Sequence, residues 1–198
     1  RARLRDGHRA RLATPGGSQV APMLPWVDDV MVRGVVWQDV SGAWPFDPQL
    51  ELDLVDELRA RAFDAAVILT SFTQSPYPPA YVAYLAGIPI RIAQSREFAG
   101  SVVTHWVRPL PDDTHQVDRN LHLLESAGFA LAGRHLELHL PADVRDAADG
   151  MLRAAGLGNG APFVAIAPGA SAEARRYDIQ RYAEVARRLA EEAHPSTG

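Results

Sequence analysis

Cysteine and lysine are both missing from this 198-residue sequence. Without cysteine the chain can form no disulfide, no iron–sulfur cluster and no cysteine-ligated zinc site, so we expect a cytoplasmic protein. Without lysine every basic side chain other than histidine is an arginine, which stays charged and binds phosphate through two parallel hydrogen bonds. This bias is typical of a GC-rich genome and identifies no site by itself.

Long apolar runs and an excess of positive charge are missing as well. The longest apolar stretch, about residues 65–69, is far too short to span a bilayer, and no segment resembles a secretory signal. We therefore expect at most peripheral contact with the inner face of the plasma membrane. The net charge of −4 and the pI of about 6.0 argue against a nucleic-acid partner. Neither a phosphate-binding Walker loop nor a Gly-x-Ser-x-Gly elbow occurs, which disfavours kinases and hydrolases.

Strands and helices alternate along the chain, a pattern that predicts an α/β fold with a parallel sheet. The stretch at 63–70 is apolar without interruption, so we expect that strand to be buried on both faces. Strands are predicted at 9–13, 29–35, 63–70, 88–93 and 163–167, and the longer helices at 50–61, 78–86, 116–127, 144–155 and 178–192.

A domain boundary is predicted between Leu140 and Pro162, where glycines cluster before a fresh strand. We expect a Rossmann-like domain at 1–141, a linker helix and loop at 142–160, and the first strand and helix of a second domain at 161–198. Residues 1–6 resemble the end of a helix, so we expect a first strand before them. In doubly wound folds that strand is central, and a sheet without it has a gap there.

The turn after the strand at 163–167 is a candidate phosphate site. Gly169, Ala170 and Ser171 would offer backbone N–H groups and one hydroxyl, and a helix follows nearby. Arg175 and Arg176 could neutralise a diphosphate. An ordinary strand–helix turn with two solvated arginines explains the same residues equally well.

Polar side chains follow the strand at 63–70 as well. Ser71, Thr73 and Gln74 lie where ligands bind in open α/β sheets, and their hydroxyl and amide groups suit a sugar. His115 and Arg119 are four residues apart, which places them on one helix face where they could bind an anion. A capping loop and a solvated helix start are the simpler explanations.

A histidine-rich segment at 135–139 suggests a metal site at first sight. Alternation explains it better, with Leu136, Leu138 and Leu140 facing inward and His135, Glu137 and His139 facing water. No suitable third ligand is visible, so we expect no metal.

Four blocks in order resemble glycosyltransferase family 9, the ADP-heptose:lipopolysaccharide heptosyltransferases. They are LPWVDDVMV at 24–32, FDAAVILTSFTQSPYPPAYVAYLAGIPIRI at 63–92, HQVDRNLHLLESAGF at 115–129, and APFVAIAPGAS…RRY…RYAEVARRLA at 161–190.

The resemblance implies a GT-B fold, in which two Rossmann-like domains face each other, and a metal-independent transfer of heptose from ADP-heptose. It implies donor contacts at Gly169, Ala170, Ser171, Arg175 and Arg176, and no cofactor. The acceptor, a cell-envelope glycan or lipopolysaccharide core, would meet the first domain at Ser71, Thr73, Gln74, His115 and Arg119. The family's catalytic base is an aspartate in a segment that this chain does not contain, so no base is assigned.

Two departures from the family leave the donor open. Tyr177 stands where tryptophan is common, and Ala167 where histidine is common. Three alternatives therefore stay open: a transferase that uses another nucleotide sugar, a nucleotide-sugar epimerase of the same fold, and a non-catalytic sugar-nucleotide-binding module.

Overall fold

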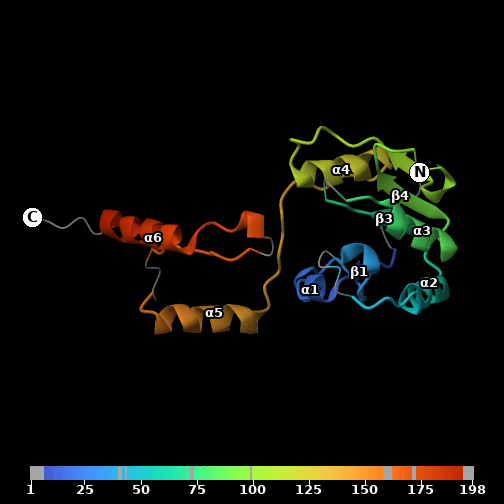
Figure 1. Cartoon of the computed structure of the whole chain (residues 1–198). Coiled ribbons are helices and arrows are strands. Elements are labelled where there is room, and N and C mark those ends of the chain that lie inside the picture. The colour runs from blue at the N-terminus through green and yellow to red at the C-terminus, as the bar shows by residue number, and fades with distance from the viewer. Residues whose placement is uncertain are drawn as a thin grey trace, which may run out of the picture. The chain divides into compact units, whose positions relative to one another are not determined.

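The computed structural model describes residues 7–39, 42, 44–71, 74–98, 100–157, 162–170 and 173–193. The chain forms two compact units, residues 1–141 and residues 142–198, which we describe separately (Figure 1).

The first unit contains two parallel sheets. One pairs β1 (Ala10–Ala13) with β2 (Asp29–Val32), and the other has the order β3-β4-β5 (Ala65–Ile68, Ile90–Gln94 and His105–Val107). The helices are α1 (Pro15–Ser18), α2 (Gln49–Arg61), α3 (Tyr77–Leu85) and α4 (Gln116–Ser126), and the short 3-10 turns are Ala21–Met23, Val36–Gln38 and Gly100–Val102. The strand β5 is not among the strands predicted from the sequence. It has only three residues, which are too few to show the two-residue periodicity of a strand.

Helices cover both faces of the larger sheet, and β4 shows how (Figure 1). Successive strand residues point to opposite faces. Ile92 packs against Leu123 of α4, and the next residue, Ala93, packs against Ala80 of α3. The larger sheet is therefore the middle layer of a three-layer α/β arrangement.

The α2 helix supplies the main core. Leu54, Val55 and Leu58 recur at helical spacing and are buried against Met31 of β2 and Ala83 of α3. The α3 helix opens with two prolines in its first turn, where the missing N–H costs nothing, and stops at Gly87, whose φ is +80°. Both observations agree with the helix bounds predicted from the sequence.

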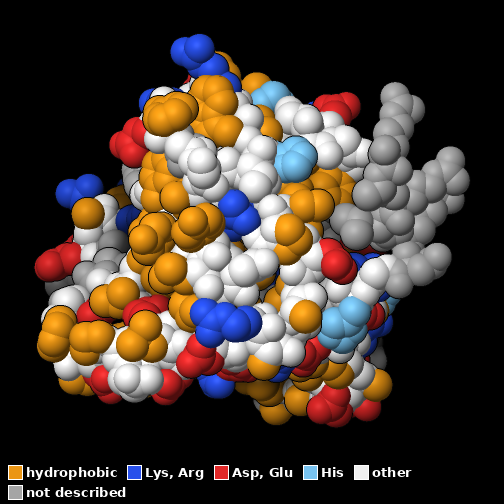
Figure 2. Space-filling view, turned by 90° about the vertical axis from the view of Figure 1, so that its right-hand side faces the viewer, with side chains coloured by type: hydrophobic (Ala, Val, Ile, Leu, Met, Phe, Trp, Pro, Cys, Tyr) orange, Lys and Arg blue, Asp and Glu red, His pale blue; other side chains and the backbone are white. Residues whose placement is uncertain are grey.

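Arginine–carboxylate pairs link these elements at the surface. Arg61 of α2 pairs with Asp29 of β2 and with Glu57 one turn away. Arg33 also pairs with Glu57, at 2.5 Å. On the face drawn in Figure 2, basic side chains stand singly or beside acidic ones. This face therefore carries no basic stripe of the kind that nucleic-acid binding requires.

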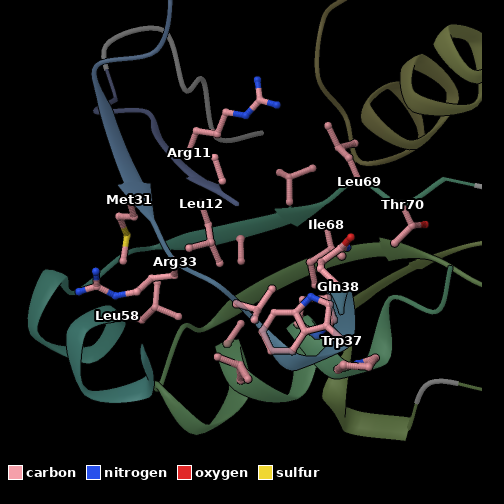
Figure 3. Close-up of a pocket in the computed structure, with 18 of the residues that line it drawn as sticks. Arg11, Leu12, Met31, Arg33, Trp37, Gln38, Leu58, Ile68, Leu69 and Thr70 are labelled. Atoms are coloured by element: carbon pink, nitrogen blue, oxygen red, sulfur yellow. The ribbon is translucent and has the colours of Figure 1, made fainter. Parts of the chain in front are cut away.

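A groove separates the two sheets. Among the described residues β1 pairs only with β2, and β3 only with β4, and all four residues of each of β1 and β3 line one hollow of about 830 Å³. In Figure 3, Leu12 of β1 and Ile68 of β3 line this hollow together with Trp37.

The prediction that the strand at 63–70 is buried on both faces is wrong. The β3 strand is not buried on both faces, because Val67 and the following Leu69 are both exposed. An unbroken apolar run predicts burial only when the strand has neighbours on both edges, and one edge of β3 borders the groove.

The segment at 131–140 also differs from its prediction. It forms no strand, and Leu136, expected to face inward, is 83% exposed, with Leu138 and Leu140 exposed as well. Alternating apolar residues are buried only when the segment is a strand of a sheet and one face of that sheet packs against another layer. The segment at 131–140 pairs with no described strand. It is attached through the His139 N–H, which donates to the Met23 carbonyl at 2.9 Å, and through an edge-to-face contact of His139 with Trp26.

The second unit contains α5 (Ala142–Ala154), a 3-10 turn at Glu173–Arg175 and α6 (Ile179–Ala193). The strand predicted at 163–167 is wrong: residues 162–170 form no regular element. A strand is stabilised by hydrogen bonds to a neighbouring strand, and none is found among the described residues of this unit. The α6 helix carries apolar residues at helical spacing, but two of them, Ile179 and Leu189, are exposed.

Candidate functional site

The first unit has a small polar pocket at the carboxyl ends of β3 and β4. Its volume is about 210 Å³. The lining is polar or charged apart from two prolines: Thr70, Ser71, Gln74, Ser75, Pro76, Gln94, Ser95, Arg96, Glu97, Pro109 and Arg119. Ligands of open α/β sheets bind in this position, because strands of one direction bring their terminal loops together at one edge.

The first wall follows β3 and was predicted from the sequence in part. Ser71 and Gln74 hold each other: the Ser71 N–H donates to Gln74 Oε1 at 3.1 Å, and the Gln74 N–H donates to the Ser71 carbonyl at 3.0 Å. The Gln74 side chain also donates to Gln38 at 3.2 Å. Thr73, the third predicted residue, lies outside the described residues.

The second wall is Arg119 of α4, which is only 5% exposed. Leu123, one turn further along the same helix face, is buried against β4, and this contact turns Arg119 toward the pocket. The Arg119 guanidinium donates to the carbonyls of Leu110 and Pro111 at 3.4 and 3.3 Å, and lies 3.7 Å from Asp112. Asp112 also pairs with Arg96.

The third wall is Gln94, which the sequence analysis did not single out. It is the last residue of β4, is 4% exposed, and shares the α4 side of the strand with Ile92. Neither its Oε1 nor its Nε2 has a hydrogen-bond partner among the described residues. An unsatisfied buried amide costs about 1–3 kcal/mol. The sequence does contain a signal for this residue, because Gln94 is a polar side chain that directly follows the apolar residues Ile92 and Ala93 of the strand.

Two further contacts hold the pocket in shape. The Tyr77 hydroxyl donates to the Glu97 carbonyl at 2.6 Å and lies 3.1 Å from Ser95 Oγ, which ties α3 to the loop after β4. Gln116 of α4 donates to the Thr70 carbonyl at 3.0 Å. The pocket is therefore built on packed elements rather than on loops alone.

His115 does not line this pocket. It is the N-cap of α4, and its Nδ1 accepts from the Val117 N–H at 3.2 Å. Its main chain supports the same turn, because the Arg119 N–H donates to the His115 carbonyl at 3.1 Å. The shared spacing of His115 and Arg119 therefore reflects a helix start, with only Arg119 reaching the pocket.

The predicted phosphate turn lies in the second unit. Gly169 and Ala170 are described, whereas Ser171 lies outside the described residues. The Arg176 guanidinium donates to the Ala170 carbonyl at 2.9 Å, so this arginine closes the turn on itself. Arg175 ends the following 3-10 turn, and its side chain is exposed.

The nearby helix start does not help to bind phosphate. Asp178 caps α6 and accepts from the N–H groups of Gln180 and Arg181 at 2.9 and 3.1 Å. These are the donors that an anion would need, and the carboxylate adds a negative charge beside them. The part of the phosphate prediction that used a helix N-terminus is therefore wrong, which leaves the turn itself and Arg175.

Among the described residues, no group of three or more histidine, aspartate or glutamate side chains could hold a metal ion. No described helix is both long enough and apolar enough to cross a bilayer.

The fold and the pocket together define an α/β protein with parallel sheets and a small polar pocket at the carboxyl edge of the larger sheet. Residues 52–195 match the model of glycosyltransferase family 9 (heptosyltransferase), and the chain belongs to this family. The resemblance noted in the sequence is thereby confirmed.

One solved structure supports the fold. It is the crystal structure of a family 9 glycosyl transferase from Veillonella parvula DSM 2008, similar at a TM-score of 0.67 and 18% identity over 92% of this chain. The chain covers 50% of that structure. No curated protein matches the chain.

Proposed function

We propose that this chain forms the acceptor-binding part, and the start of the donor-binding part, of a GT-B glycosyltransferase. The reaction is the transfer of a sugar, with heptose from ADP-heptose as the expected donor, to a cell-envelope glycan or lipopolysaccharide core. The observation that carries the proposal is a hydroxyl- and amide-lined pocket at the carboxyl ends of β3 and β4 in a family 9 chain.

Ser71, Gln74 and Arg119 would position the acceptor in this pocket. Their hydroxyl, amide and guanidinium groups match the hydroxyl groups of a sugar. Thr73, which lies outside the described residues, is assigned to the acceptor from the sequence alone. His115 would act indirectly: it caps α4 and so stabilises the first turn of the helix, which positions Arg119. Fixing the acceptor hydroxyl in one orientation lowers the entropic part of the barrier to transfer.

The donor diphosphate would meet the turn at Gly169, Ala170 and Ser171, with Arg175 and Arg176 beside it. Transfer breaks the bond between the sugar and the diphosphate, and negative charge develops on the leaving oxygen. Arg175 is exposed and ends the turn, so its guanidinium is the group we assign to that charge. Arg176 instead keeps the turn closed through Ala170.

The acceptor hydroxyl must also lose a proton, which requires a carboxylate base. Asp28 and Asp29 are not assigned as this base, because each carboxylate forms an ion pair with an arginine, Asp28 with Arg9 and Asp29 with Arg61. The leaving-group charge is assigned to arginine and backbone donors, which makes the proposed reaction metal-independent.

The test is ligand-induced thermal stabilisation of the complete protein with ADP-heptose, UDP-sugars and GDP-sugars. A shift with ADP-heptose alone supports the proposed donor. A shift with another nucleotide sugar keeps the transferase and replaces the donor. No shift with any of them favours a binding module without catalysis, and turnover of a nucleotide sugar without acceptor favours an epimerase.

Substitution of Arg175 by alanine tests the donor site. We expect turnover to fall by about a hundredfold or more, since a charge that stabilises the transition state is removed. Arg181→Ala is the matched control, because this arginine lies over the Tyr177 ring and outside the turn. Unchanged turnover in Arg175→Ala would exclude the assigned role.

A further inference from the structure

The Gln94 amide is a feature of the pocket that the contacts among the described residues do not explain. Other buried polar side chains nearby have partners. Arg91 donates to the carbonyls of Val102 and Ser101 at 2.7 and 3.0 Å, and Ser95 accepts from the Glu97 N–H at 3.0 Å. Gln94 is equally buried, yet neither of its polar atoms is bonded among the described residues. Such a group is costly to keep unless something binds it.

The chemistry of the amide indicates what that partner must offer. The carbonyl oxygen accepts and the adjacent NH₂ group donates, so the complement is one donor and one acceptor on neighbouring atoms. Two adjacent hydroxyls of a sugar ring provide this pair. An ionised carboxylate does not, because it only accepts and would leave Gln94 Oε1 without a donor.

The charges around the pocket favour a neutral ligand as well. Arg119 and Arg96 share Asp112, and Glu97 also lines the pocket. Two positive charges are thus balanced by two negative ones. An anionic ligand would have to compete with Asp112 for its arginines, whereas a hydroxyl ligand leaves those pairs intact.

The size of the pocket limits the ligand to a single ring. Pockets for drug-sized ligands have volumes of about 300–1,000 Å³, and this one has about 210 Å³. We propose that Gln94 is a specificity-determining residue, whose side-chain amide binds two adjacent hydroxyls of one neutral sugar ring. The inference rests on the proposed function in one respect, namely that this ring belongs to the acceptor.

The direct test is a titration of the isotope-labelled chain followed by NMR. The probe is methyl α-D-mannopyranoside, with its 3-deoxy analogue, which has no two adjacent ring hydroxyls, and with methyl glucuronide and inorganic phosphate as comparisons. We expect the mannoside to shift the side-chain NH₂ signal of Gln94 and to bind about tenfold more tightly than the deoxy analogue. A Gln94 signal that moves only with phosphate or glucuronide, or with no probe, overturns the proposal.

Gln94→Met is the matching protein variant, because it keeps the length of the side chain and removes both polar atoms. We expect it to bind the mannoside about tenfold more weakly, with a melting temperature that is unchanged or raised. We expect the deoxy analogue to bind Gln94→Met about as tightly as it binds the unaltered chain, because the loss of the hydroxyl and the loss of the amide remove the same contact. Equal mannoside affinity in Gln94→Met and the unaltered chain also overturns the proposal.

Two other glutamines serve as controls. Gln116→Met should lower the melting temperature, because Gln116 donates to Thr70 and to Asn120. Gln49→Met should change neither property, because Gln49 pairs with Asp53 at the surface of α2. If Gln94→Met does not fold, the comparison of mannoside with its deoxy analogue on the unaltered chain still decides the question.

Kinetics of the complete enzyme separate this inference from the proposed function. We expect Gln94→Met to raise KM for the acceptor and to leave KM for the donor unchanged. Normal acceptor KM in the variant would refute the role of Gln94 while the transferase stands. Mannoside binding at Gln94 in a protein that transfers no sugar would refute the function while the binding site stands.

Discussion

Some single residues of this chain stabilise the fold, whereas others are not required by the fold and could serve ligand binding. Arg91 belongs to the first group: it is buried, lies over the Tyr84 ring at 5.3 Å and donates to several carbonyls between Ile88 and Val102. Gly169 belongs to the second. A β-carbon at that position would meet no atom within 4 Å, so the fold does not require glycine there.

Gly169→Ala therefore separates folding from donor binding. We expect the melting temperature to stay the same, because the added methyl group meets open space. We expect donor affinity to fall about tenfold if the backbone contacts the diphosphate, because close approach needs a residue without a side chain. Thermal melting with and without nucleotide sugar measures both. Unchanged donor affinity would argue against contact at this turn.

Two carboxylates at the start of β2, Asp28 and Asp29, make stability depend on pH. The hydrogen bond from Arg61 lowers the pKa of Asp29 below its ordinary 3.8, and the hydrogen bonds from Arg9 do the same for the pKa of Asp28. A lowered folded-state pKa means that the unfolded chain binds protons first. This contribution is therefore complete above pH 3.8 and is lost as the pH falls through the lowered folded-state pKa.

We expect the melting temperature to fall more steeply below pH 4 in the unaltered chain than in Asp29→Asn, in which this proton linkage is absent. Melting curves between pH 2.5 and 7, in steps of about half a pH unit, measure the difference. Asp53→Asn, on the exposed side of α2, is the control and should keep the steep slope. Parallel slopes for Asp29→Asn and the unaltered chain would contradict the assignment.

Among the elements, α4 contacts both the core and the pocket. Its C-terminal half packs Leu123 against β4, and its N-terminal half delivers Arg119 and Gln116 to the carboxyl ends of the strands. The first turn is held by the His115 cap. The position of α4 thus joins the core to the site, and the cap should influence the site only through stability.

His115→Ala tests this separation. We expect a loss of about 1 kcal/mol in the free energy of unfolding, typical for removal of an N-cap side chain. His115→Ser should recover most of this loss, because serine also caps, and acceptor KM should be normal in the serine variant. Urea unfolding and acceptor kinetics measure the two effects. A raised acceptor KM in a fully stable His115→Ser protein would show direct contact with the acceptor.

At the scale of the whole molecule, the chain consists of two units that differ in how they are packed. The first has a buried core across α2, α3 and both sheets. In the second, no described residue is buried, and the apolar stripe of α6 is exposed. The segment at 131–140 leads from the first unit to the second without regular structure.

This arrangement predicts where a protease cuts first. Brief digestion with trypsin should cleave after Arg134, because that segment is exposed and its backbone can enter a protease site. The ion pair of Arg134 with Asp118 lies at the surface and should protect little. Mass spectrometry of the first fragments locates the cut. A first cut within α2, for example after Arg59, would contradict this prediction.

Much of the architecture was predictable because its signals are local. Helical spacing of Leu54 and Leu58, the prolines that open α3 and the glycine that ends it are all readable within one turn of chain. The family is readable for a related reason, since its blocks keep their order along the chain. The sequence by itself therefore determined the fold class, most helix bounds, the family and the polar loop at Ser71 and Gln74.

Only the tertiary structure decided which of the predicted residues meet. It placed Arg119 in the pocket and turned His115 into a cap, although both lie on one short stretch of chain. It also brought Gln94 of β4 into the same pocket as Ser71 after β3. The physical reason is that burial and proximity depend on which layers pack together, and no periodicity within a single segment records the segment that lies across from it.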